Sequence, residues 1–145
     1  MNVNGSVTPQ KFYFQPSASR VCELHRMLIE VDDNAAAGVD EFGAAMALTN
    51  GVLIRVIDSG ENVILDLLDG EAIKSNGDWA KHCYDAQNIG INLSGDDIWT
   101  VRWSFDRAGQ PLWFPVGHDY RLEVVIQDDL TSLVDFHIMV QGYYD

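Results

Sequence analysis

The sequence lacks the local patterns that build most catalytic and metal-binding sites. No two of its four histidines are two or four residues apart, so no single strand or helix presents a pair to a metal. A GxSxG nucleophile elbow, a glycine-rich phosphate loop and an EF-hand pattern are also absent. We therefore expect no catalytic residue, no cofactor and no metal. An enzyme of the cupin or glycosidase kind stays a minor alternative, because paired glycosidase carboxylates meet only in three dimensions.

Basic residues are scarce. The chain has 9 Lys and Arg against 22 Asp and Glu, which gives a formal net charge of −13. Binding to a phosphate backbone needs clustered Lys and Arg, and the sequence has no such cluster. We therefore expect neither nucleic acid nor an anionic membrane as a partner. The acidity suits a basic partner surface, and an ordinary solvated acidic face explains it equally well.

Cysteines and long apolar runs are also few. Cys22 and Cys83 form no CxxC motif, which leaves a disulfide and two buried free thiols open and favours the thiols. No apolar run approaches the roughly 18 residues of a membrane helix. Residues 1–20 lack the basic start and apolar stretch of a signal peptide. These features predict a protein made in a reducing cytoplasm.

What the sequence does contain is a series of short strands. A chain of 145 residues with 47% hydrophobic residues is typical of one globular domain. Alternating or β-prone residues predict strands at 27–31, 52–57, 62–67, 89–93, 99–105, 112–114, 120–126 and 134–140. Asn76 or Asp78 is expected to cap a short helix that ends near Tyr84. The pattern predicts an all-β fold, a jelly-roll-like β-sandwich with about eight strands and one or two short helices.

The start of the chain differs from the rest. It is small, polar and interrupted by proline, so residues 1–20 are predicted as an extended N-terminal arm and residues 21–145 as a single β-sandwich domain. Within the arm, Phe12, Tyr13 and Phe14 form an aromatic run between two prolines. This run fits either a docking arm or an edge strand of the protein's own sheet, and the edge strand is favoured.

Aromatic residues are the main candidates for contact with a partner. Trp99 and Trp103 share one face of a strand with hydrophobic neighbours, so they are expected in the core. Trp113 is flanked by prolines two residues away on either side, which favours exposure. The residues predicted to bind a partner are Phe12, Tyr13, Phe14, Trp113, Phe114, Tyr143 and Tyr144.

Two features favour a small ligand instead. Tryptophans such as Trp113 stack on sugars in carbohydrate-binding modules. Pairs of aspartates recur in turns at residues 32–33, 96–97 and 128–129, and clustered carboxylates can hold calcium. Aspartate is also common in turns because it accepts local backbone hydrogen bonds. A carbohydrate- or calcium-binding module is therefore an alternative to a protein-binding role.

Three stretches of the sequence together resemble a family of viral structural proteins. Residues 47–54 read ALTNGVLI, residues 72–79 read AIKSNGDW and residues 126–131 read IQDDLT. With a likeness over about residues 25–142, the chain resembles small β-sandwich virion proteins of tailed bacteriophages, of the capsid cement or decoration type.

The resemblance implies a jelly roll that is made in the host cytoplasm and binds the outer surface of an assembled capsid in the virion. There it would cement neighbouring capsomers through non-covalent contacts, with the major capsid protein as partner. It also implies a symmetric homo-oligomer, a dimer or trimer, without cofactor or catalytic residues. In the same setting, the alternative is a carbohydrate- or calcium-binding module of a phage tail or host-recognition apparatus.

Overall fold

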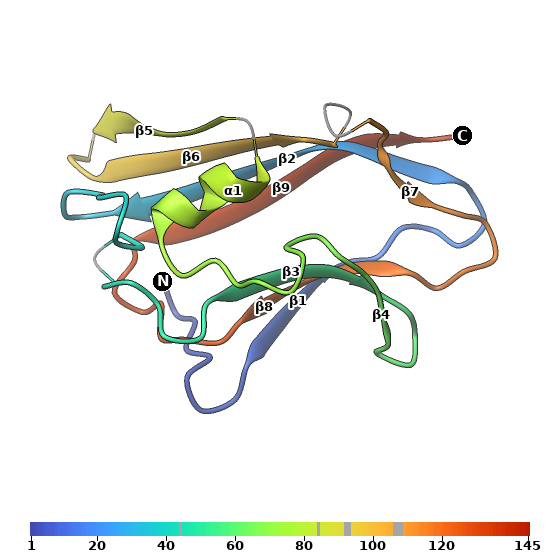
Figure 1. Ribbon diagram of the computed structural model, residues 1–145, viewed down its shortest axis with the longest axis horizontal. Coiled ribbons are helices and arrows are strands. Elements are labelled where there is room, and N and C mark those ends of the chain that lie inside the picture. The colour runs from blue at the N-terminus through green and yellow to red at the C-terminus, as the bar shows by residue number, and fades with distance from the viewer. Residues whose placement is uncertain (44, 84, 92–93, 106–108) are drawn as a thin grey trace.

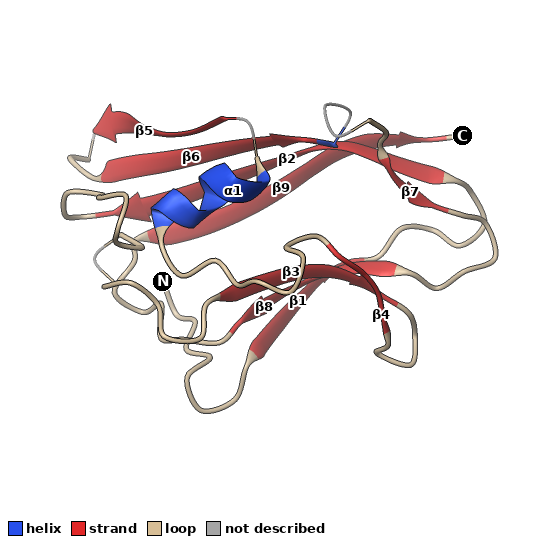
Figure 2. Cartoon of the chain, in the orientation of Figure 1, coloured by secondary structure: helices blue, strands red, loops and turns tan. Residues whose placement is uncertain are grey.

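Two antiparallel sheets pack face to face in the computed structural model, which describes residues 1–43, 45–83, 85–91, 94–105 and 109–145 (Figure 1). One sheet has the order β1-β8-β3-β4. In the other sheet, β2 pairs with β9 along one side, and along its other side it pairs with β6 and then, near its start, with β7. β5 pairs with the far side of β6. The remaining described residues form loops and one short helical segment (Figure 2). The predicted all-β sandwich is confirmed. Its strands in the described residues are β1 (Gln10–Phe14), β2 (Cys22–Asp33), β3 (Val52–Ile57), β4 (Val63–Asp66), β5 (Asp85–Ile91), β6 (Asp97–Ser104), β7 (Leu112–Phe114), β8 (Arg121–Ile126) and β9 (Asp135–Tyr144).

The longest strand, β2, lies at the centre of its sheet and changes its inward-facing parity once. Cys22 and Leu24 face the core, and after a bulge between Leu24 and Arg26 the inward positions are Met27 and every second residue to Asp33. On β9, Gly142 lies opposite this bulge. A Cβ there would be 1.9 Å from the carbonyl oxygen of Glu23, so only glycine fits.

In the other sheet, β8 is buried on both faces. Its inward residues are hydrophobic, and on its outward face Glu123 has no exposed surface. A buried carboxylate is stable only when it is paired. Here Glu123 Oε1 accepts a hydrogen bond from Arg55 Nε at 2.6 Å, and the Lys11 Nζ lies 3.8 Å from Oε2.

The predicted N-terminal arm is part of the sandwich. β1 pairs with β8 along its whole length, so the edge-strand alternative for the aromatic run is confirmed. Ahead of β1, the amino group of Met1 donates to the carbonyl of Leu133. The backbone N–H of Gly5 donates to Asp128 O at 2.8 Å. The first residues are therefore held against the loop that joins β8 to β9.

The short helix predicted near residue 76 is present. A 3₁₀ turn at Asn76–Asp78 continues into α1 (Trp79–His82), in which Trp79 is fully buried. The Asp78 carboxylate accepts hydrogen bonds from the backbone N–H groups of Lys74 and Ser75, which fixes the start of the segment. Tyr84, where the helix was expected to end, lies outside the described residues. β5 begins at Asp85, four residues before the predicted strand, and residues 92–93 of that prediction are also outside the described part.

Both cysteines are free and buried, as the favoured alternative predicts. Burial raises the pKa of Cys22, and it raises the pKa of Cys83 to about 11. None of the described helical segments has the length and apolar character needed to cross a membrane.

The three stretches that carry the viral resemblance meet at one end of the sandwich. The Asp128 carboxylate accepts hydrogen bonds from the backbone N–H groups of Thr49 at 3.1 Å, Asn50 at 3.0 Å and Gly51 at 2.6 Å. The next residue, Val52, exchanges two backbone hydrogen bonds with Ile73. These stretches therefore form one hydrogen-bonded structural unit.

Candidate functional site

The outer face of the β5-β6-β2-β9 sheet carries a mixed polar and apolar surface. Residues that lie opposite one another in register share a face of a sheet, so the pairings define rows across it. One row runs Asp85, Arg102, Leu28, Met139. The neighbouring row runs Ser104, Arg26, Gln141.

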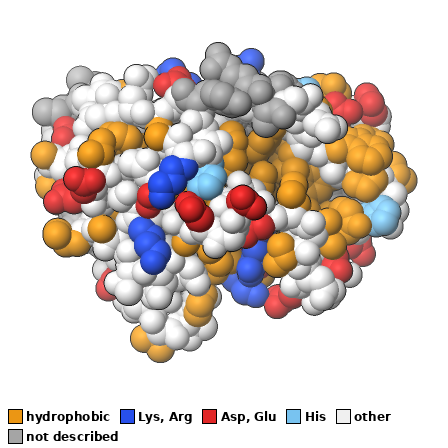
Figure 3. Space-filling model, viewed as in Figure 1, with side chains coloured by type: hydrophobic (Ala, Val, Ile, Leu, Met, Phe, Trp, Pro, Cys, Tyr) orange, Lys and Arg blue, Asp and Glu red, His pale blue; other side chains and the backbone are white. Residues whose placement is uncertain are grey.

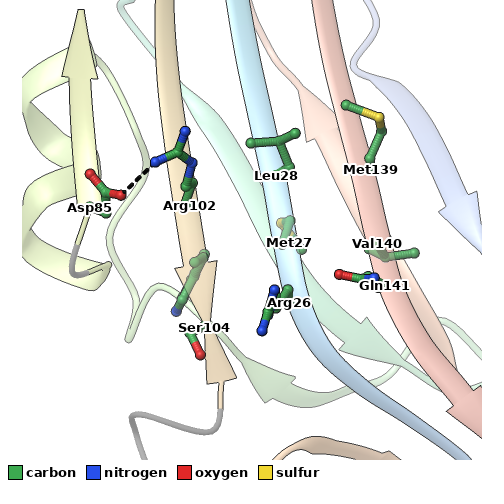
Figure 4. A pocket seen from close by; sticks show the side chains of 10 residues that line it. Arg26, Met27, Leu28, Asp85, Arg102, Ser104, Met139, Val140 and Gln141 are labelled. Carbon is green, nitrogen blue, oxygen red and sulfur yellow. Dashed lines mark hydrogen bonds and ion pairs between the residues drawn. The ribbon is translucent and has the colours of Figure 1, made fainter. Parts of the chain in front are cut away.

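These two rows line a hollow of about 550 Å³ (Figure 4). In it, the Arg102 guanidinium points toward Asp85, with Nη1 3.2 Å from Oδ2. Leu28 and Met139 lie side by side and give the floor an apolar strip. The hollow therefore offers guanidinium donors, amide and hydroxyl groups and an apolar contact, which suits binding by hydrogen bonds and packing.

An exposed aromatic pair extends this face beyond the hollow, at the end where β7 lies. Trp113 and Tyr143 are on opposite sides of Glu23 in one row, and they are 58% and 52% exposed. His25 stacks on Tyr143 with 5.0 Å between ring centroids, and its Nε2 is 3.6 Å from the Glu23 carboxylate. In Figure 3, large hydrophobic groups gather toward the same end of the molecule. We call Trp113, Glu23, Tyr143 and His25 the aromatic row.

The other residues predicted to contact a partner are dispersed. Phe114 is 3% exposed and lies in the core, so it is not available to a partner. Phe14 also packs against the core. Phe12 and Tyr13 are partly exposed on opposite faces of β1, and the Arg121 guanidinium lies 4.3 Å from the Tyr13 ring centroid. The Arg20 guanidinium lies over the Tyr144 ring, 5.2 Å from the ring centroid.

A second hollow opens between the two sheets, where the edge strands β1 and β9 lie on the same side of the sandwich. It has a volume of about 400 Å³ and is lined almost entirely by apolar side chains. From β9 these are Phe136, Ile138 and Val140; from the opposite sheet they include Phe12 and Val124. We call it the edge groove.

The structure brings two of the predicted aspartate pairs together but does not form a metal site from them. Asp33 lies directly opposite Asp97 on adjacent strands and is fully buried. Burial raises the pKa of Asp33, and the nearby charges of Asp97 and Asp96 raise it further. Within the described residues, no group of three or more His, Cys, Asp or Glu side chains is placed to hold a metal ion.

The sequence analysis did not predict the hollow, although strand alternation already places several of its residues on outward faces. The alternation in β2 places Arg26 and Leu28 on the outward face, and that of β6 does the same for Arg102. What the sequence does not give is that β2 separates β6 from β9, which brings Arg102 and Met139 to one row.

Fold and surface together define an antiparallel β-sandwich with an exposed face of mixed polar and apolar residues on one sheet. Comparisons with family models, curated proteins and solved structures find no match for the chain.

Proposed function

We propose that the protein is a non-catalytic structural protein that attaches to a larger protein assembly through the outer face of the β5-β6-β2-β9 sheet. The assembly that the sequence resemblance implies is a phage capsid, whose outer surface the protein would bind and cement. Its partner would then be the major capsid protein.

The observation that carries the proposal is the kind of side chain on this face. Protein interfaces are enriched in Trp, Tyr, Met and Arg, and their energy is concentrated in a few such residues. Trp113 and Tyr143 are exposed, and Arg26, Arg102 and Met139 continue the same surface around the hollow. Two exposed aromatic rings beside a hollow lined by arginine, methionine and leucine suit contact with a protein surface.

The test is binding to purified capsid shells of the phage that encodes the protein, measured by co-sedimentation. Changing Trp113→Ala and Tyr143→Ala together should weaken binding at least roughly thirtyfold, because interface anchors of this type contribute about 2 kcal/mol or more. Ile64→Ala is the matched control, since Ile64 is a similarly exposed residue on β4 of the other sheet. Absence of the protein from purified particles by mass spectrometry, or equal weakening by the control, would refute the proposal.

A second candidate function is binding of a neutral oligosaccharide, favoured by the spacing in the aromatic row. Trp113 and Tyr143 are on strands separated only by β2, so their backbones are about 10 Å apart. One extended sugar chain can reach both rings, and Glu23 between them can accept hydrogen bonds from hydroxyl groups. A glycan array probed with the protein and with Trp113→Ala tests this; uniformly flat signals would remove the candidate.

A further inference from the structure

Among the described residues, the edge strands are β1 and β4 in one sheet and β5, β7 and β9 in the other, and four of these five carry features that prevent pairing with another chain. Natural edges are protected by shortness, charge, proline or a bulge. β4 has only four residues and ends in Asp66. β1 carries Lys11 and lies between two prolines. β5 has a bulge between Asn88 and Gly90. β7 has only three residues and lies between two prolines.

The fifth edge strand, β9, carries charge only near its ends: Asp135 begins it, and the Arg20 guanidinium donates a hydrogen bond to the backbone carbonyl of Tyr144. The strand is ten residues long, and residues 136–144 contain no Asp, Glu, Lys, Arg or Pro. Its pairing with β2 runs without a shift from Asp135 to Gln141, so the strand is regular along this stretch. Its outward side chains are exposed, Met139 by 45%. An unprotected edge of this length is a template for one more strand.

The surroundings of β9 favour a second copy of this chain as that strand. The edge groove opens beside β9, and three β9 side chains, Phe136, Ile138 and Val140, line it. A strand added at this edge would bring further apolar side chains over the opening. An identical strand supplies the same apolar residues at the same inward positions, which gives a self-complementary contact.

We propose that two chains associate through antiparallel pairing of their β9 strands about a two-fold axis, so that the β5-β6-β2-β9 sheets of both copies become one continuous sheet. An axis perpendicular to the sheet keeps the outward residues of both copies on one face. It therefore passes either at an outward residue such as Met139 or at an inward residue such as Val140.

Charge and shape select the register centred on Met139. With the axis at Val140, Asp135 of one copy would face Asp145 of the other, and opposed like charges destabilise strand pairs. With the axis at Met139, Asp135 faces Tyr143 instead. The same register sets Phe136 opposite Gly142, where an aromatic ring covers the surface that a glycine leaves bare.

This pairing uses the backbone edge of β9, so it does not depend on the capsid partner proposed above, although it sets Asp135 of the second copy beside Tyr143 of the aromatic row. It can be tested on the isolated protein. Sedimentation should give twice the mass of one chain at micromolar concentration. A single-chain mass at all accessible concentrations would overturn the inference.

Single cysteines test the register. Met139→Cys should give a covalent dimer on mild oxidation or with a short bismaleimide, because residues opposite each other have Cβ atoms about 5 Å apart. Gln141→Cys is the matched control: its two copies would be roughly 13 Å apart along the strands and should not be joined. The native Cys22 and Cys83 are buried and should not interfere. Equal cross-linking at both positions, or at neither, would overturn the register.

A charge variant tests the edge itself. Met139→Lys places two ammonium groups together at the axis and should raise the dimer dissociation constant roughly tenfold or more. Ile89→Lys is its control, because Ile89 is 50% exposed on β5, the opposite edge of the same sheet. Equal dimerisation of the Met139→Lys variant and the unmodified protein would contradict pairing at β9.

Discussion

Asp128 offers the sharpest test of how the sandwich is held together. Its carboxylate is the shared acceptor for three consecutive backbone N–H groups, those of Thr49, Asn50 and Gly51. The Gly51 N–H is buried and makes the shortest of the three bonds, at 2.6 Å. We predict that Asp128→Ala destabilises the protein mainly through this group, which is buried and loses its hydrogen-bond acceptor with the carboxylate.

The magnitude follows from the three bonds. A buried donor left without a partner costs about 1–3 kcal/mol, and the two partly buried donors of Thr49 and Asn50 add about 0.5 kcal/mol each because water can replace part of their bonds. The expected loss is about 3 kcal/mol of unfolding free energy. For a chain of this size that corresponds to a fall of roughly 10 °C in melting temperature.

The neighbouring Asp129 is the control for this prediction. Its carboxylate accepts hydrogen bonds only from the backbone and hydroxyl of Thr131, two residues away, in an exposed turn. Thermal and urea unfolding, followed by circular dichroism and tryptophan fluorescence, should show a large loss for Asp128→Ala and a much smaller one for Asp129→Ala. Equal losses would refute the argument that Asp128 joins separate segments.

Three further predictions concern other positions in the two sheets, each measured by urea unfolding. Gly142→Ala should cost about 3 kcal/mol because its Cβ would collide with a backbone carbonyl at the β2 bulge, whereas a Cβ at Gly38 has room and should cost far less. Arg55→Met should cost about 3 kcal/mol by leaving the buried Glu123 carboxylate without its main partner, and adding Glu123→Gln should recover most of that loss. Asp33→Asn should stabilise the protein by about 1 kcal/mol at pH 7. Burial raises the folded pKa of Asp33, so ionisation opposes folding above that pKa, and the gain should vanish as the pH falls to the ordinary value of 3.8.

Much of the strand pattern is readable from local sequence. The segment 112–114 is predicted with the bounds that β7 has, and the inward positions of Trp99 and Trp103 follow from alternation. Both residues are buried because their neighbours on the same face are hydrophobic, which is a local property. Segments whose pattern is set by one buried face are therefore the ones that sequence reasoning places well.

The ends of two strands escaped prediction for a physical reason. The bulge after Leu24 interrupts the alternation of β2, so the residues from Cys22 onward do not extend the period that begins at Met27. At the other end of the chain, Gly142 indicates a turn by its type, yet it lies within β9 because the bulge requires a residue without a Cβ. A contact between two strands that are far apart in the sequence thus determines the structure of both segments.

The candidate site was only partly predictable, because its geometry depends on strand order. Trp113 was expected to be exposed and Tyr143 to bind a partner, and both side chains are exposed. Their placement on either side of Glu23 depends on β7 and β9 both pairing with β2. Phe114 shows the converse: it adjoins Trp113 in sequence but faces the core, because successive residues of a strand point to opposite faces.

The charge of the chain bears on where copies can meet. A formal charge of −13 makes most contacts between two copies repulsive. The stretch of β9 from Phe136 to Tyr144 contains no Asp, Glu, Lys or Arg, so charge repulsion between two copies is weak there. The acidic residues elsewhere disfavour other contacts between two copies. Backbone hydrogen bonds and the apolar edge groove favour the proposed pairing of the two β9 strands. In the proposed dimer, each copy uses its β9 edge once, so the pairing is closed and leaves no β9 edge for a third copy.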